Sequence, residues 1–382
     1  MSFEITKLLQ LMVQHDASDL YLTSEAPPQY RVNGVLRPAG TVALKDTETE
    51  ALANSIMNDK QQREFLACNE MNLALFYPAL GRFRVNVFRQ RGAVGVVVRQ
   101  IKTKILGIDD LELPQVLKEI SLTKRGLVLI VGATGSGKST TLAAVVDYRN
   151  QNSAGHIITI EDPIEFVHMH KKSIVTQREV GLDTADFQTA LKNSLRQAPD
   201  VILLGEIRDT ETMEAALTFA ETGHLCLATL HSNNANQAME RVMNFFPAER
   251  HQQIYLQLSL NLRGIVSQRM VGTVDSGRVV AVEVLLDSPR VKDLIHKAQI
   301  AELKEAMEKS VNLGMQTFDQ ALFDLYRKGR ISLEEALKNA DSANNLRLRV
   351  KLEEEGGFDK VPSMKRSDND GGASAMGLKI DG

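Results

Sequence analysis

Hydrophobic residues in the first hundred positions follow two different periods. At helical spacing they predict one amphipathic helix over residues 3–15, with Phe3, Ile5, Leu8, Leu9, Met12 and Val13 on one face. Residues 82–89 alternate instead, which predicts a half-buried strand with Phe83, Val85 and Val87 on one face and Arg82, Arg84 and Asn86 on the other. Asn33-Gly34 lies between β-favouring residues, the pattern of a tight hairpin. We therefore expect residues 1–102 to form an α+β domain built on a sheet.

A second pattern begins near residue 116, where short apolar runs alternate with stretches of helical character. The apolar runs predict strands at 127–131, 157–161, 201–205, 225–230 and 279–286. This alternation is typical of an α/β fold, a mainly parallel sheet with helices on both faces. Residues 289–340 favour further helices, so we place one domain over 116–345.

Two segments lie outside these domains. Residues 103–115 contain Gly107 and Pro114 and are predicted to be a linker. Residues 346–382 are predicted to be a polar and disordered tail, most clearly from residue 353, where glycine and charged residues dominate.

The chemistry begins with a glycine-rich loop after the run 126–131. The loop reads Gly132-Ala-Thr-Gly-Ser-Gly-Lys-Ser139, and a helical pattern follows it, which is the strand–loop–helix setting of a phosphate-binding motif. Glycines let backbone N–H groups approach phosphates, and the helix N-terminus adds partial positive charge. Lys138 would reach the β- and γ-phosphates, and Ser139 would ligate Mg²⁺. The predicted nucleotide contacts are Ala133, Thr134, Gly135, Ser136, Gly137, Lys138, Ser139 and Thr140.

Acidic residues follow two of the predicted strands. Glu206 comes after the run 201–205, at the carboxyl end, where ligands collect in open α/β sheets. Asp200 precedes that strand and would lie at the wrong end for a metal. Three carboxylates within five residues, the last of them Glu165, follow the run 157–160. We expect these acids to supply the groups that hold Mg²⁺ and position water.

Histidine and arginine positions are less decisive. His231 follows the strand 225–230, where it could sense a γ-phosphate, whereas a lone histidine is more often a structural residue. Arg82, Arg84 and Arg99 could stabilise phosphate charge from the first domain. The residues alone favour the simpler alternative, a solvated edge of a sheet.

Composition excludes several classes of protein. The 382 residues include 45 Lys plus Arg and 48 Asp plus Glu, a balance that gives no reason to expect nucleic-acid binding. An apolar run of 18 residues is missing, as is an apolar signal region at the start, so we expect a cytoplasmic protein. The two cysteines, Cys68 and Cys226, form no C-x-x-C pair for zinc, and Cys226 lies in a run that predicts a core position.

Several separated segments together resemble the type IV pilus retraction ATPases, a branch of the secretion ATPase superfamily. These segments are 132–144, 158–168, 177–180, 199–209, 221–231 and 313–319. The resemblance implies a PAS-like N-terminal domain, a RecA-like ATPase domain and a hexameric ring. It also implies ATP and Mg²⁺, with Glu165 as general base, Glu206 as the Walker B carboxylate and metal ligand beside Ser139, and His231 as a sensor. In that family arginines of the N-terminal domain reach the nucleotide, which favours a role for Arg82, Arg84 and Arg99.

One departure from the family pattern lies outside the predicted nucleotide site. Retraction ATPases carry an Ala-Ile-Arg signature where this chain has Ser288-Pro-Arg-Val-Lys-Asp-Leu-Ile. This difference and the polar tail resemble the accessory paralogues of the family. The resemblance thus implies a homo-hexamer that works with a PilT-like retraction ATPase and an inner-membrane platform protein, peripheral to the cytoplasmic face. Alternatives are a regulatory ring subunit with little turnover, or a pilus assembly or type II secretion ATPase, although assembly ATPases usually carry a zinc-type cysteine cluster.

Overall fold

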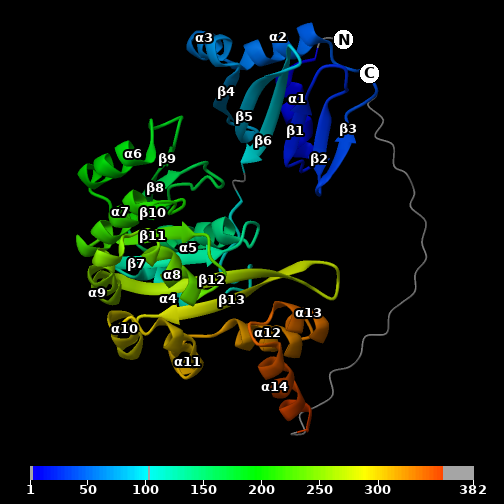
Figure 1. Ribbon diagram of the computed structural model, residues 1–382. Coiled ribbons are helices and arrows are strands. Elements are labelled where there is room, and N and C mark those ends of the chain that lie inside the picture. The colour runs from blue at the N-terminus through cyan, green and yellow to red at the C-terminus, as the bar shows by residue number, and fades with distance from the viewer. Residues whose placement is uncertain (1–2, 102–103, 356–382) are drawn as a thin grey trace. The chain divides into compact units, whose positions relative to one another are not determined.

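The computed structural model describes residues 3–101 and 104–355. The chain divides into two compact units, the first made mainly of residues before Ile105 and the second mainly of those after it (Figure 1). Each unit has its own hydrophobic core.

The first unit is an antiparallel sheet of six strands in the order β3-β2-β1-β6-β5-β4. The strands are β1 (Asp19–Leu22), β2 (Gln29–Val32), β3 (Val35–Pro38), β4 (Glu70–Tyr77), β5 (Gly81–Gln90) and β6 (Ala93–Ile101). Three helices share the core with this sheet: α1 (Ile5–Gln14), α2 (Asp46–Ile56) and α3 (Asp59–Cys68).

The local patterns of this unit are confirmed. Phe83, Val85 and Val87 of β5 are fully buried, as their alternation predicts. Asn33 and Gly34 form the two-residue turn between β2 and β3 with φ of 50° and 81°, values that this pair of residues adopts readily. The helix predicted over 3–15 is α1.

The second unit contains a sheet of seven strands in the order β13-β12-β7-β11-β10-β8-β9. All neighbours are parallel except β12 and β13, which are antiparallel. The strands are β7 (Gly126–Gly132), β8 (Gly155–Glu161), β9 (Ser173–Glu179), β10 (Val201–Leu204), β11 (Leu225–Leu230), β12 (Leu262–Gly272) and β13 (Arg278–Leu286).

Helices cover both faces of this sheet. Leu129 and Val131 of β7 enter one core and Val128 and Ile130 the other, so the central strand is buried on both sides, as its unbroken apolar run predicts. The helices beside the sheet are α4 (Val116–Leu122), α5 (Lys138–Asn152), α6 (Phe187–Ser194), α7 (Thr210–Glu221), α8 (Ala235–Met243) and α9 (His251–Asn261). The C-terminal helices are α10 (Pro289–His296), α11 (Leu303–Glu308), α12 (Phe318–Arg327), α13 (Leu333–Asn339) and α14 (Ala343–Glu355). The predicted α/β architecture with a helical C-terminal part is confirmed.

In the second unit, two strands and one boundary differ from our prediction. Strands β9 and β12 were not expected, because arginine and glutamine interrupt their apolar positions. The tail that we placed from residue 346 is wrong for its first ten residues, since α14 extends to Glu355. Leu346 and Val350, one turn apart, are buried against α12 and α13, so an apolar stripe holds a helix whose other faces are polar. Residues 356–382 of the predicted tail lie outside the described residues.

Within residues 3–101 and 104–355, every helix is too short or too polar to cross a bilayer.

Candidate functional site

The glycine-rich loop connects β7 to α5, and its glycines are favoured by positive φ angles and, at Gly132, also by close packing. Gly132, Gly135 and Gly137 have φ of 157°, 79° and 91°. A side chain at Gly132 would place its Cβ 2.4 Å from Ser136 Oγ and 2.7 Å from the carbonyl oxygen of Gln268. The loop therefore folds back on itself so tightly that only glycine fits at its start.

Lys138, at the first turn of α5, turns back into this loop. Its Nζ donates to the carbonyl oxygens of Gly132 at 2.8 Å and Ala133 at 3.0 Å and lies 3.5 Å from His231 Nδ1. Partial burial lowers the pKa of Lys138, and the charge of Glu206 opposes that shift. The ammonium group thus lies where it can meet both the loop and the acidic residue at the end of β10.

Contacts continue from His231 across the ends of neighbouring strands. Glu206 accepts from Arg208 Nε at 2.6 Å through Oε2, and its Oε1 lies 3.0 Å from His231 Nε2. Arg208 Nη1 lies 3.2 Å from Asp162 Oδ2. The hydrogen bond with Glu206 raises the pKa of Arg208. Because β8, β10 and β11 are parallel neighbours, residues that follow them meet at one edge of the sheet.

The structure thus brings Lys138, Glu206 and His231 together, as their places at strand ends predict. Sequence reasoning did not single out Asp162 and Arg208, although both lie in quoted segments beside predicted site residues. Asp200 lies at the opposite end of β10, where its carboxylate accepts from His156 N at 2.7 Å.

Two further predicted residues, Ser139 and Glu165, are accessible to solvent, and Glu165 is grouped with the first unit. Ser139 lies in the first turn of α5 and Glu165 in the segment after β8. Glu161 is the last residue of β8 and accepts hydrogen bonds from Thr159 and Gln177. It therefore has a structural role in holding β9 beside β8.

The predicted arginines belong to the first unit. Arg82 and Arg84 are half-buried on the polar face of β5, and Arg84 pairs across the sheet with Arg99 of β6. Arg99 Nε donates to the buried Asp19 at 2.8 Å, a hydrogen bond that raises the pKa of Arg99. The three arginines thus share the polar face of two neighbouring strands, and their part in nucleotide binding stays a prediction.

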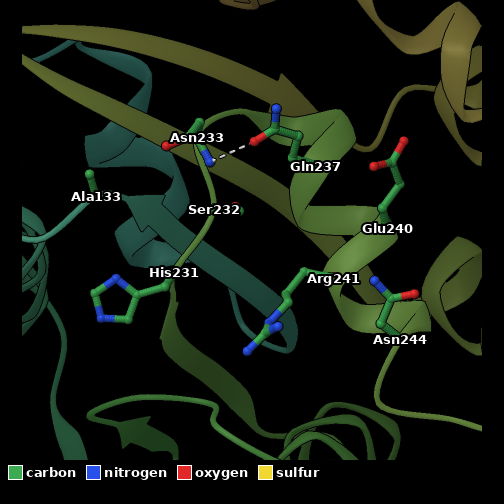
Figure 2. A pocket seen from close by; sticks show the side chains of 8 residues that line it. All are labelled: Ala133, His231, Ser232, Asn233, Gln237, Glu240, Arg241 and Asn244. Carbon is green, nitrogen blue, oxygen red and sulfur yellow. Dashed lines mark hydrogen bonds between the residues drawn. The ribbon is translucent and has the colours of Figure 1, made fainter.

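Two pockets are lined in part by the glycine-rich loop. The larger, about 400 Å³, is shown in Figure 2; it is lined by Ala133, His231, Ser232, Asn233, Gln237, Glu240, Arg241 and Asn244. The smaller, about 220 Å³, is lined by Ala133, Thr134, Gly135, Ser136, Asn233, Gln268, Arg269 and Met270. Ala133 and Asn233 contribute to both, so the loop and the segment after β11 form a shared wall.

Two polar atoms beside the smaller pocket have unused hydrogen-bonding capacity. Ser136 Oγ and Gln268 Oε1 are buried and have no hydrogen-bond partner within the described part of the chain. Gln268 Nε2, by contrast, donates to Thr141 Oγ1 at 2.7 Å, which fixes the amide against α5. Buried polar atoms in native proteins nearly always have partners, so this wall suits a polar ligand.

Comparisons with known proteins agree with this geometry. A family model described as Type II/IV secretion system protein matches residues 3–346. The type IV pilus ATPase PilU of Pseudomonas aeruginosa is 55% identical over 362 residues, 94% of this chain and 95% of that protein. The chain belongs to the PilT/PilU family of pilus retraction ATPases. PilT of the same organism is 44% identical, over 90% of this chain and 99% of that protein.

A solved structure supports the same family. The crystal structure of the pilus retraction motor PilT with bound ADP has a TM-score of 0.85 and 39% identity, and the match covers 91% of this chain and 99% of that one. Within the PilT/PilU family, the chain is thus more similar to the PilU of P. aeruginosa than to its PilT. This order agrees with the altered segment 288–295.

Proposed function

We propose that this protein is a Mg²⁺-dependent ATPase that acts as a hexameric motor of the type IV pilus machinery. The observation that carries the proposal is the cluster of Lys138, His231 and Glu206 beside a phosphate-binding loop. A cation, an imidazole ring and a carboxylate meet where the ends of three parallel strands converge, and nucleotide hydrolysis in P-loop enzymes uses such a cation and such a carboxylate.

The residues present fit a nucleotide with its metal. The loop has no room for a side chain at Gly132, and the buried Ser136 Oγ lacks a partner within the described residues. Backbone N–H groups of residues 133–140 would hold the phosphates, and Lys138 would exchange its loop carbonyls for phosphate oxygens. Ser139 and Glu206 would hold Mg²⁺, which neutralises phosphate charge when bound.

The water-activating role belongs to Glu165 in this proposal, with His231 as the sensor. Glu165 is exposed in the segment after β8, so water can reach its carboxylate, as a general base needs. His231 contacts both Lys138 and Glu206, so its ring would respond to a ligand that displaces either residue. Arg82, Arg84 and Arg99 would add positive charge from an N-terminal unit of the ring.

The proposed motor is accessory rather than sufficient for retraction. In the segment that departs from the Ala-Ile-Arg signature, Pro289 occupies the first turn of α10 and Ser288 Oγ accepts from Val291 N at 3.3 Å. Proline suits a first helical turn, so the helix start is kept while its surface chemistry changes. We propose that the ring acts with a PilT-like partner and a platform protein at the cytoplasmic face of the inner membrane.

Two experiments test the ATPase activity and the accessory role in retraction separately. Purified protein should hydrolyse ATP only with Mg²⁺, and Lys138→Ala should abolish turnover because a charge-assisted contact to phosphate is lost. Wild-type turnover in that variant would refute the enzymatic assignment. In cells with fluorescent pili, retraction should need the PilT-like partner even when this protein is present. Retraction at normal frequency without that partner would reject the accessory role.

A further inference from the structure

Arg269 of β12 connects the smaller pocket to the C-terminal helices. It lines the pocket together with Ser136 and Asn233. Its guanidinium Nη1 donates to the carbonyl oxygen of Asn339 at 2.7 Å, and Nη2 lies 2.6 Å from Asp341 Oδ1. One side chain thus touches the nucleotide-binding half of the unit and the connection between α13 and α14.

Two further contacts fix the plane of this guanidinium. Its Cζ lies 3.9 Å from the centre of the Phe318 ring, at the start of α12. Nη2 also donates to the carbonyl oxygen of Asn233 at 3.5 Å, in the segment between His231 and α8. A planar, rigid fork that stacks on a ring and binds in several directions is a geometry that lysine cannot reproduce.

The C-terminal side of this contact is itself a network. Asp341 N donates to Asp319 Oδ1 at 2.8 Å, and Lys304 Nζ lies 3.1 Å from Asp319 and 3.7 Å from Asp341. The start of α12 and the segment before α14 are therefore tied to one another and to Arg269. A shift of the guanidinium would therefore alter contacts of α12, of α13 and of the segment before α14.

We propose that Arg269 is a positioning residue that couples nucleotide in the smaller pocket to the order of the helices α12–α14. The proposal rests on the proposed function, because the ligand is the nucleotide. A ligand that contacts Ser136, Gln268 or Asn233 alters the pocket wall on which Arg269 lies. Since the guanidinium is shared with Asp341 and Asn339, that change reaches helices that form no part of the pocket.

Linkage makes this coupling measurable from both ends. If nucleotide stabilises the contact of Arg269 with Asp341, then that contact strengthens nucleotide binding by the same factor. Couplings of this kind typically amount to about 5- to 150-fold in affinity. Asp341 does not line the pocket, so an effect of its substitution on affinity would report coupling and not a lost ligand contact.

The experiment uses the full chain and a fluorescent ADP analogue. Asp341→Asn and Arg269→Lys should each weaken binding of the analogue by at least about fivefold, and the double variant should be no weaker than the weaker single one. In amide hydrogen exchange, ADP should slow exchange of residues 333–350 in the wild type and leave it unchanged in either variant. Arg327→Gln, which breaks the ion pair of α12 with Glu353 of α14, is the matched control and should retain wild-type affinity.

The outcomes separate this inference from the proposed function. If wild-type protein binds no nucleotide, the proposed function itself fails. If it binds and hydrolyses ATP but Asp341→Asn leaves affinity within twofold, the coupling is refuted. Equal losses in Arg327→Gln and Asp341→Asn would also overturn it, because they would show a general effect of loosened helices. Melting temperatures of all variants identify a variant that has simply lost its fold.

Discussion

Glu283 offers a quantitative test of how the candidate site is supported. It lies on β13, is 2% exposed, and its Oε1 accepts from Ala235 N at 2.8 Å and from Ser267 Oγ at 2.9 Å. Ala235 begins α8 two residues after Asn233, which lines both pockets. Burial raises the pKa of Glu283 from 4.5 to about 7, although these two hydrogen bonds oppose the shift.

The raised pKa fixes the sign of a pH effect on stability. Between about pH 4.5 and 7 the folded protein holds this proton more tightly than the unfolded chain does, so folding is favoured at the acidic end. Stability from this group is therefore full below the unfolded pKa and is lost as the pH rises towards the folded one. A shift of this size corresponds to a loss on the order of 3 kcal/mol.

Glu283→Gln removes the titration and keeps an oxygen that can accept from Ala235 and Ser267. The free energy of unfolding of the variant minus that of the wild type should increase by on the order of 3 kcal/mol from about pH 5 to about pH 8. Urea unfolding of both proteins at the two pH values measures this difference. The exposed Glu221→Gln on α7 is the control and should show the same difference from the wild type at both pH values. A pH-independent effect of Glu283→Gln, or one of opposite sign, would refute the reasoning.

Three further outcomes follow from the site. Glu206→Gln should bind ATP and slow hydrolysis by about 10²- to 10⁴-fold, since its carboxylate contacts His231 and would hold the metal; a rate within twofold of wild type would exclude that role. Glu165→Gln should show a loss of similar size with nucleotide affinity retained, and a normal rate would mean that another group activates water. Light scattering should detect a ring in the presence of ATP, and a strict monomer well above micromolar concentration would contradict the motor.

Local patterns predicted the parts of the fold whose stability is local. The hairpin at Asn33-Gly34 depends on two backbone conformations that these residues favour, and the loop at Gly132 depends on the absence of side chains. The central strands of the second unit were found because both their faces are buried. Strands β9 and β12 lack such an unbroken apolar run, and the same criterion therefore missed them.

The polar residues of β12 make contacts that become apparent only in the assembled sheet. Gln268 of β12 places one amide nitrogen on Thr141 of α5, and Arg269 reaches the end of α13. Both residues interrupt an apolar run and hide the strand. Asp162 and Arg208 were likewise not singled out, because their contact joins residues 46 positions apart, and no spacing along the chain reports it.

Strands β12 and β13 support the candidate site by holding the segment that follows β11. The segment from His231 to Ala235 is held at two points: Arg269 binds the carbonyl of Asn233, and Glu283 accepts from Ala235. Both supports come from the antiparallel pair β12–β13, while the loop and Lys138 come from β7 and α5. A parallel sheet ending at β7 would bring the catalytic candidates together but leave this segment without those contacts. The added strand pair therefore does more than extend the sheet, because it fixes the wall that the two pockets share and connects it to the C-terminal helices.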